Sequence, residues 1–140
     1  MANLRHIAVF DVGKTSCKLV LMKGTDFTEI EVLRQEFSVL TGPPYPHLDS
    51  DAMWSFLCDG LAAFENNHGI DALAITTHAS TAGLVDADGL VLPIQDYEFE
   101  IPSEVAAEYD ILRPEFEKTY SPRMPGGLNL GAQLHFLRSE

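Results

Sequence analysis

Hydrophobic residues in the first forty positions fall into the short runs that are typical of β-strands. Residues 6–12 and 17–22 are apolar, rich in β-branched side chains and separated only by Gly-Lys-Thr-Ser. A turn signal, Lys-Gly-Thr-Asp, follows, and residues 29–37 then alternate Ile30 and Val32 with acids. Three consecutive strands with short connections predict an antiparallel meander.

The hydrophobic period changes after the proline-rich segment 41–49, which we predict to be a loop. Asp49 and Ser50 are candidate N-caps for a helix that ends at Asn-Asn-His-Gly. Apolar residues repeat along it at helical spacing: Met53, Phe56, Leu57, Leu61 and Phe64. We expect Trp54, which lies among them, to pack in the core or against another subdomain.

Residues 70–77 are apolar enough to predict a buried strand. A hairpin is predicted next, with strands at 82–86 and 90–94 and its turn at Asp88 and Gly89. Strands that precede and follow a helix along the chain indicate an α/β domain with a mixed sheet.

Two helices are expected in the last third of the chain. The first covers 103–109, and the second follows the loop 121–127. One face of the second is marked by Leu130, Leu134 and Leu137. No stop signal follows that helix, which favours a chain cut within a longer pattern.

Composition and charge exclude several classes of protein. A chain of 140 residues with 46% hydrophobic and 21% charged residues is typical of one soluble globular domain. The net charge of −12 argues against binding to nucleic acid or to an anionic membrane. Apolar runs are too short for a membrane span or a signal peptide. Cys17 and Cys58 lie in unrelated segments, so we expect free thiols in a cytoplasmic protein.

Candidate chemistry is concentrated in 11-DVGKTSCK-18, between the first two strands. Glycine lets a backbone approach a phosphate, hydroxyls and lysine can bind its oxygens, and an aspartate can hold Mg²⁺ beside it. The segment has neither a Walker nor a Rossmann glycine pattern. On this motif alone, an ordinary β-turn and a phosphate-binding loop are equally open.

Together with three further stretches, the motif resembles the FGGY carbohydrate kinases, particularly their L-fuculokinase and rhamnulokinase branch. These stretches are 48-LDSDAMWSFLCDGL-61, 72-ALAITTHASTAGLVDADGLVLPI-94 and 128-LNLGAQLHFL-137, in the family's order. The resemblance implies a ribonuclease H-like, or actin-like ATPase, α/β fold with a mixed sheet. It covers residues 1–140 as the N-terminal part of the first domain of a two-domain sugar kinase.

The resemblance also implies a phosphate site that binds ATP with Mg²⁺. Asp11 would hold the Mg²⁺ through water, and the backbone of Gly13, Lys14 and Thr15, with the Thr15 hydroxyl, would face the γ-phosphate. Lys18 occupies the position of a basic residue in many relatives, although an exposed strand lysine is an equally good interpretation. Lys14 replaces the commoner hydroxyl residue.

The sugar site implied by the resemblance involves Thr77, His78, Ser80 and Thr81, with Tyr97 at an aromatic position. Ser80 and Thr81 depart from the Val-Asp of the fuculokinase-like pattern, and no arginine follows Tyr97 closely. These departures leave the identity of the sugar open.

The resulting expectation is ATP-dependent phosphorylation of a ketose such as fuculose, rhamnulose or xylulose. The catalytic base of the family lies beyond residue 140, so no catalytic residue is expected in this chain, which alone should be inactive and could self-associate. Two alternatives are a sugar- or nucleotide-sensing protein without catalysis and an actin-like assembly domain. Retention of Asp11 and Thr15 favours the kinase over the sensor.

Overall fold

The computed structural model describes residues 4–140, which form two compact units. The first, here the sheet unit, comprises residues 4–39 and 49–78. The second, here the helical unit, comprises residues 40–48 and 79–140. The chain therefore passes from one unit to the other and back before it enters the second half of the sequence.

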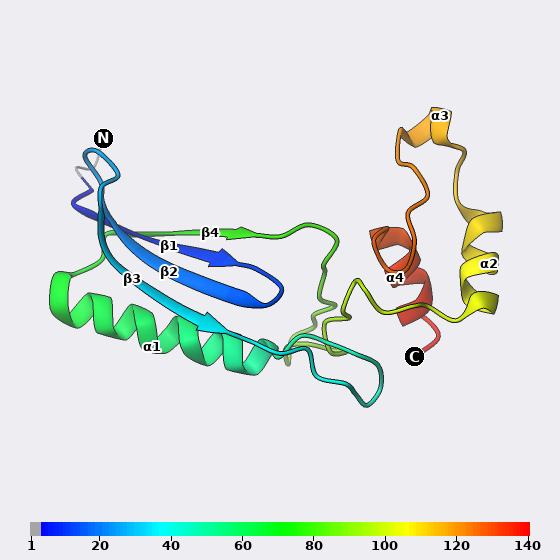
Figure 1. Ribbon diagram of the computed structural model, residues 1–140, viewed down its shortest axis with the longest axis horizontal. Helices are drawn as coiled ribbons and strands as arrows, with labels where there is room; N and C mark the ends of the chain where they lie inside the picture. The colour runs from blue at the N-terminus through cyan, green and yellow to red at the C-terminus, as the bar shows by residue number, and fades with distance from the viewer. Residues whose placement is uncertain (1–3) are drawn as a thin grey trace. The chain divides into compact units, whose positions relative to one another are not determined.

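A four-stranded mixed sheet forms the first unit (Figure 1). Its strands are β1 (His6–Val12), β2 (Ser16–Lys23), β3 (Glu29–Glu36) and β4 (Ala72–Thr77), in the order β3-β2-β1-β4. The first three strands pair antiparallel, and β4 pairs parallel to β1. The predicted meander and the mixed sheet are thus confirmed.

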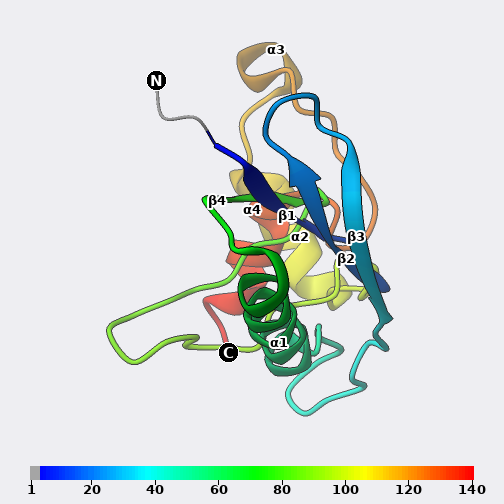
Figure 2. The ribbon, with the colours of Figure 1, turned by 90° about the vertical axis from the view of Figure 1, so that its left-hand side faces the viewer.

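Helix α1 (Ser50–His68) runs along one face of this sheet (Figure 2). Its N-cap is Asp49, as predicted, because the Asp49 carboxylate accepts the N–H of Ala52 at 3.1 Å. Gly60 faces the sheet so closely that a Cβ there would lie 2.6 Å from Cδ2 of Leu19. A methyl group there would have to displace the fully buried Leu19 side chain, so a glycine favours packing of the helix at this distance.

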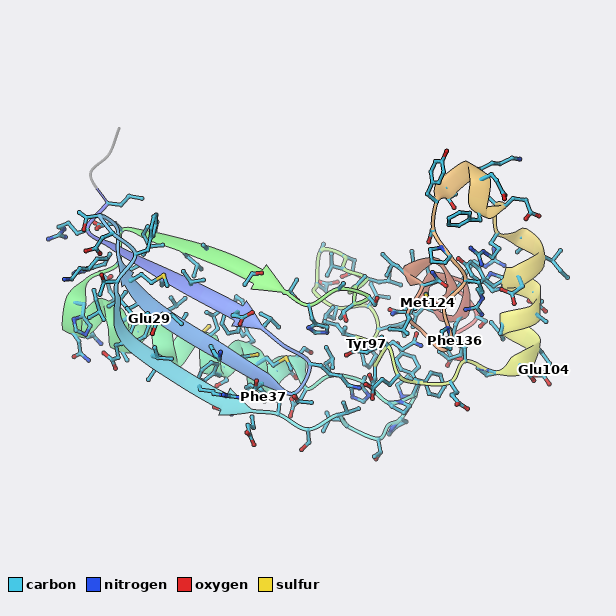
Figure 3. The ribbon with its side chains drawn as sticks, turned by 45° about the horizontal axis from the view of Figure 1, so that its top comes forward. Glu29, Phe37, Tyr97, Glu104, Met124 and Phe136 are labelled. Carbon is cyan, nitrogen blue, oxygen red and sulfur yellow. The ribbon has the colours of Figure 1, made fainter. Side chains whose placement is uncertain are left out.

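The apolar core of the sheet unit lies between α1 and the central strands. Phe56 of α1 has its ring centroid 6.3 Å from that of Phe10 and 6.1 Å from that of Phe37. Phe37, labelled in Figure 3, follows β3 and is buried. This packing secures the end of the sheet at which the β1–β2 turn lies.

Of the two roles predicted for Trp54, packing in the core is wrong, because this residue is 67% exposed. The buried stripe of α1 is Met53, Leu57, Gly60 and Phe64. One helical residue turns the side-chain direction by about 100°. Trp54 comes one residue after Met53 and therefore points away from the sheet.

The predicted strand at 70–77 exists as β4, but the prediction that it is buried is wrong. Ile75 is 63% exposed, and Leu73 is exposed as well. β4 lies at the edge of the sheet, and α1 packs over β1 and β2 instead. A continuous apolar run reports a strand's composition but cannot show what covers it.

The helical unit contains α2 (Ser103–Leu112), a single turn α3 (Phe116–Thr119) that sequence did not predict, and α4 (Leu130–Leu137). Its core contains Tyr45, Phe136 and Leu137. Phe136, labelled in Figure 3, stacks against Tyr45 and Phe99 with ring-centroid distances of 5.6 and 5.5 Å. The expected helices near 103–109 and 130–137 are confirmed.

The predicted strands 82–86 and 90–94 are wrong, since the described chain has only an isolated bridge between Val85 and Leu90 there. The turn itself is present, because the Asp86 carboxylate accepts the N–H groups of Asp88 and Gly89. Because the Asp86 side chain stabilises the turn, the turn can form without two regular paired strands next to it. No helix within residues 4–140 is long and apolar enough to cross a membrane.

The two cysteines should differ sharply in reactivity. Cys17 is 0% exposed, and burial raises the pKa of its thiol, with the nearby Asp11 adding to the effect against an opposing backbone hydrogen bond from Gly13. Cys58 is exposed. Iodoacetamide at pH 8 should alkylate Cys58 alone in the folded chain and both cysteines in urea, as peptide mass spectrometry would measure. Rapid native labelling of Cys17 would contradict this packing.

Asp71 should stabilise the sheet unit in a pH-dependent way. Its carboxylate accepts the N–H groups of His6 at 3.0 Å and Arg5 at 2.7 Å, and these bonds lower its pKa below 3.8. A lowered pKa gives stability that is present above pH 3.8 and lost as pH falls through the folded-state value. Asp71→Ala should therefore unfold at lower urea than wild type at pH 7, and the difference should shrink below pH 3.8. A difference that is independent of pH would contradict this role.

Candidate functional site

The segment between β1 and β2 forms a tight turn of Gly13, Lys14 and Thr15 (Figure 1). The Gly13 N–H donates to the Ser16 carbonyl at 3.0 Å, which closes the turn. The Thr15 carbonyl accepts the N–H of Phe37 at 2.9 Å, which ties the turn to the residue after β3. The predicted phosphate loop is therefore a turn anchored on both sides.

Gly13 is needed in this turn because of a close backbone approach. A Cβ at Gly13 would lie 2.7 Å from the Ser16 carbonyl oxygen, closer than real Cβ atoms come to an oxygen. Any other residue would push the turn open. The glycine that the motif contains thus has a structural reason independent of any ligand.

Thr15 is the residue of the turn that faces solvent. Neither its N–H nor its hydroxyl makes a hydrogen bond to any residue that the structure describes. Two donors on one exposed residue at a turn are suited to an anion such as a phosphate group. Lys14 is partly buried beside it.

Strand register places charged residues side by side next to this turn. Asp11 of β1 pairs with Lys18 of β2, and Lys18 pairs with Arg34 of β3. On the other side, Asp11 pairs with Thr76 of β4. Because paired residues share a face of the sheet, the four side chains form one row across all four strands.

Arg34 is a candidate that the sequence reasoning missed, because only the register of β3 places it beside Lys18. It also lines an open pocket of about 290 Å³ with Thr15 and Ser16. Neither Arg34 nor Lys18 makes an ion pair with another residue in the range 4–140. Two cations therefore stand next to the turn with their charge available to a ligand.

The donor set at Asp11 fits Mg²⁺. Residues 4–140 hold no group of three His, Cys, Asp or Glu side chains that could enclose a metal. The Asp11 carboxylate is exposed and has no hydrogen bond or ion pair in the same range. Mg²⁺ keeps several waters and is commonly held by one or two carboxylates together with substrate phosphates, so a single carboxylate beside a turn with exposed donors suits it.

His78 is held directly by the strand that carries Asp11. The Val12 carbonyl accepts both the His78 backbone N–H at 3.0 Å and the Nδ1–H of its ring at 3.1 Å. A carbonyl can only accept, so Nδ1 carries a proton. Thr77 pairs with Val12 and lies on the opposite sheet face from Asp11, whereas Thr76 shares the face of Asp11.

The other predicted sugar residues lie in the helical unit. Ser80 donates its hydroxyl to the Leu128 carbonyl at 2.9 Å, and the Tyr97 carbonyl accepts the N–H of Gly127 at 3.0 Å. Both residues are thus connected to the loop 126–128, and Tyr97 is labelled in Figure 3. Thr81 lies half-buried next to Ser80.

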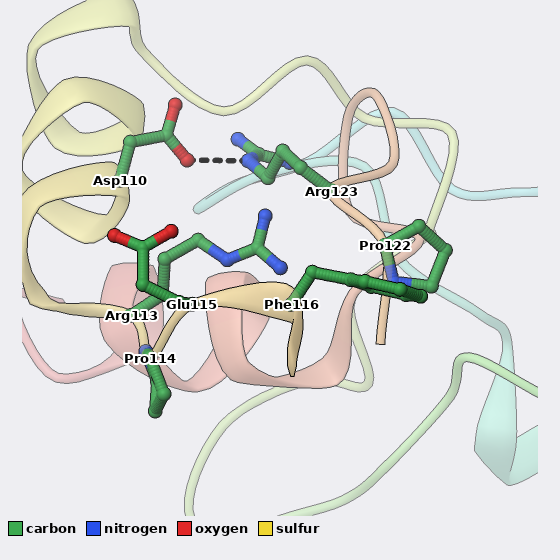
Figure 4. Close-up of a pocket in the computed structure, with 7 residues that line it drawn as sticks. All are labelled: Asp110, Arg113, Pro114, Glu115, Phe116, Pro122 and Arg123. Atoms are coloured by element: carbon green, nitrogen blue, oxygen red, sulfur yellow. Dashed lines mark hydrogen bonds and ion pairs between the residues drawn. The ribbon is translucent and has the colours of Figure 1, made fainter. Parts of the chain in front are cut away.

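A larger open pocket of about 510 Å³ in the helical unit contains none of the predicted site residues (Figure 4). Its two arginines are used within the fold. Arg113 donates to the Ser121 carbonyl at 2.7 Å, and Arg123 pairs with Asp110 at 2.5 Å. Arg123 is ion-paired, Arg113 is bonded to a backbone carbonyl, and the acids Asp110 and Glu115 also line the pocket, so it suits an anion less well than the β1–β2 turn does.

Among solved structures, this chain is similar to carbohydrate kinases. It is 32% identical to a carbohydrate kinase from Novosphingobium aromaticivorans, with a TM-score of 0.86, over 94% of this chain and 28% of that one. A gluconate kinase and a xylulose kinase, both from Lactobacillus acidophilus, match with TM-scores of 0.61 and 0.60 at 18% and 17% identity. These two matches cover 77% and 76% of this chain and 23% and 22% of theirs. No family model matches the sequence, and no curated protein matches it significantly.

These similarities establish the fold as the ribonuclease H-like fold of the actin-like ATPases, as carbohydrate kinases have it. The expected fold class is confirmed. The chain spans about 28% of the length of the Novosphingobium kinase, so the remainder of such a protein has no counterpart here. The more specific fuculokinase or rhamnulokinase branch finds no support among these structures.

Gly13→Ala should destabilise the sheet unit by about 1–3 kcal/mol, because its Cβ meets a backbone oxygen that cannot move without disturbing the turn. Urea unfolding followed by circular dichroism would measure the loss. Gly83→Ala is the matched control, since a Cβ there meets only the side chains of Leu90 and Ile94. Equal losses in the two variants would contradict the steric role of Gly13.

Proposed function

We propose that this chain is the N-terminal part of an ATP-dependent sugar kinase, corresponding to part of its first domain. The proposed reaction transfers the γ-phosphoryl group of ATP to a hydroxyl of a ketose such as xylulose, fuculose or rhamnulose. Two free cysteines are in keeping with a reducing cytoplasm as its location.

One observation carries the proposal. The β1–β2 turn, with the exposed Thr15 donors, lies next to a row in which Asp11 stands beside Lys18. An anion-binding turn, a carboxylate for Mg²⁺ and a cation are the parts that phosphoryl transfer requires for positioning and charge stabilisation. The likeness to carbohydrate kinases supports a sugar as the acceptor.

At the phosphate end, Thr15 would donate its N–H and hydroxyl to γ-phosphate oxygens, with the backbone of Gly13 and Lys14 alongside. Lys18 would neutralise phosphate charge, and Arg34 beside it would extend the positive field. Asp11 would orient Mg²⁺ through bound water. When bound, this ion would neutralise the phosphate charge that develops during transfer.

At the sugar end, Thr77, His78, Ser80, Thr81 and Tyr97 would orient the acceptor. The hydrogen bond of Nδ1–H to the Val12 carbonyl would fix the orientation of the His78 ring toward the sugar. The acceptor oxygen would bond to the γ-phosphorus as the bond to the β–γ bridging oxygen breaks. The hydroxyl proton would go to a carboxylate base contributed by chain beyond residue 140.

The 140-residue chain alone should not phosphorylate sugars, because that base and the adenosine pocket would lie outside it. We favour the kinase over a sensor without catalysis because the Asp11 carboxylate has no internal partner in residues 4–140. A protein that only senses a ligand does not need an Mg²⁺ carboxylate opposite the γ-phosphate.

The test compares wild type with Asp11→Asn in the complete polypeptide, using Mg-ATP and a panel of ketoses and gluconate. Wild type should phosphorylate at least one sugar. Loss of the carboxylate should lower kcat by about 100-fold or more, because charge stabilisation during transfer is lost. Coupled detection of ADP gives the rate.

Asp26→Asn is the matched control, since Asp26 is an exposed carboxylate in the turn between β2 and β3, at the other end of β2. It should keep wild-type turnover. Full turnover in Asp11→Asn would refute the role of Asp11. Wild type that binds sugar and ATP but transfers no phosphoryl group would favour the sensor.

A further inference from the structure

Ser80 has a backbone conformation that serine rarely adopts. Its φ is 60°, in the left-handed region, which is unfavourable for a residue with a side chain. Such a conformation persists only where the surroundings hold it. Ser80 is also one of the residues proposed above to orient the sugar.

Gln133 of α4 is the group that holds Ser80 from inside the helical unit. Its side chain is 1% exposed, and its Nε2 donates to the Ser80 carbonyl and to the Gly127 carbonyl, both at 2.5 Å. The Ser80 hydroxyl adds a bond of 2.9 Å to the Leu128 carbonyl. The Ser80 carbonyl is thus bonded to α4, and the Ser80 hydroxyl is bonded to the loop before α4.

The same amide reaches Tyr97 through one further bond. Gly127, whose carbonyl accepts from Gln133, donates its own N–H to the Tyr97 carbonyl at 3.0 Å. A Cβ at Gly127 would lie 3.1 Å from that carbonyl oxygen, so the two segments are in close contact. One side chain therefore connects the Ser80 segment with the Tyr97 segment.

We infer that Gln133 is a positioning residue that sets the geometry of the sugar-binding segments at Ser80 and Tyr97 without touching the sugar. This inference rests on the proposed function. Without the Nε2 donor, the Gly127 and Ser80 carbonyls lose a partner at a buried and a part-buried place, and only the hydroxyl bond to Leu128 is left to offset the strain at Ser80. The Ser80 segment would then relax toward ordinary backbone conformations and bind the sugar poorly.

Gln95 gives a matched comparison within the same unit. It is 0% exposed, but neither polar atom of its side chain has a hydrogen-bond partner within residues 4–140. Replacing an unpartnered buried amide by an apolar side chain of similar size should cost little stability or add some. Gln95→Met therefore controls for the loss of a buried glutamine amide as such.

The first readout uses the complete polypeptide. Gln133→Met should raise the sugar KM by about tenfold or more while leaving the ATP KM and kcat close to wild type. Gln133→Glu keeps the side-chain length but replaces the donor nitrogen by an acceptor oxygen, and it should act in the same direction. A merely structural role would instead lower the active fraction, and therefore kcat, with no change in sugar KM.

The strain argument predicts a further dependence on residue 80. Glycine adopts a φ of 60° without penalty, so the segment would no longer need to be held in place. The effect of Gln133→Met on sugar KM should therefore be smaller in a Ser80→Gly background, as a double-mutant cycle measures. Equal effects in the two backgrounds would contradict the strain argument.

A second readout does not require catalysis. In the 140-residue chain, amide-hydrogen exchange at Gly127 should be faster in Gln133→Met than in wild type, and unchanged in Gln95→Met. Unchanged exchange at Gly127, or an active Gln133→Met enzyme with wild-type sugar KM, would overturn the inference. Absence of turnover in wild type on every sugar would instead refute the proposed function, and exchange at Gly127 would still decide whether Gln133 holds this network.

Discussion

The register of β1 in the interior of the sheet is the constraint on which the candidate site depends. β1 pairs with β2 on one side and β4 on the other, so Asp11 has a fixed neighbour on each. A slip of one residue in either pairing would move Lys18 or Thr76 to the opposite face. The chemistry proposed for this end of the sheet is thus a consequence of backbone hydrogen bonding.

Two close contacts keep that register in place. Gly13 permits a turn that is too tight for a side chain, and this short turn fixes the pairing of β1 with β2. Gly60 lets α1 approach Leu19 of β2, so the helix packs where the strand is fully buried. At each glycine a Cβ would be too close to a neighbouring atom. That atom is a backbone oxygen at Gly13 and a side-chain carbon at Gly60.

The two units hold their candidate site residues by different means. In the sheet unit, repeated strand pairing fixes Asp11, Lys18 and the backbone of His78. In the helical unit, where residues 79–102 form no regular element, single side-chain bonds take over this task. Gln133 is the clearest example, because one buried amide replaces what a ladder would otherwise supply. Irregular backbone near a binding site needs such bonds if it is to be ordered.

Local chemistry made much of this protein predictable. Strands β1 to β3, the Asp49 cap and the β1–β2 turn follow from apolar period, capping preference and glycine, all of which act over a few residues. The failed expectations concern longer-range relations. The apolar segment of β4 gave no sign that it would be an edge strand, and the Asp88-Gly89 turn gave no sign that its flanks would form only an isolated bridge.

The sequence by itself determined the order of strands and helices and the residues available at the β1–β2 turn, because these depend on neighbours along the chain. Only the tertiary structure decided that Trp54 faces solvent, that Arg34 stands beside Lys18, and that Gln133 holds Ser80 in a left-handed conformation. Each of these depends on helix phase, strand register or a contact between distant segments. Such relations are fixed when the elements pack together.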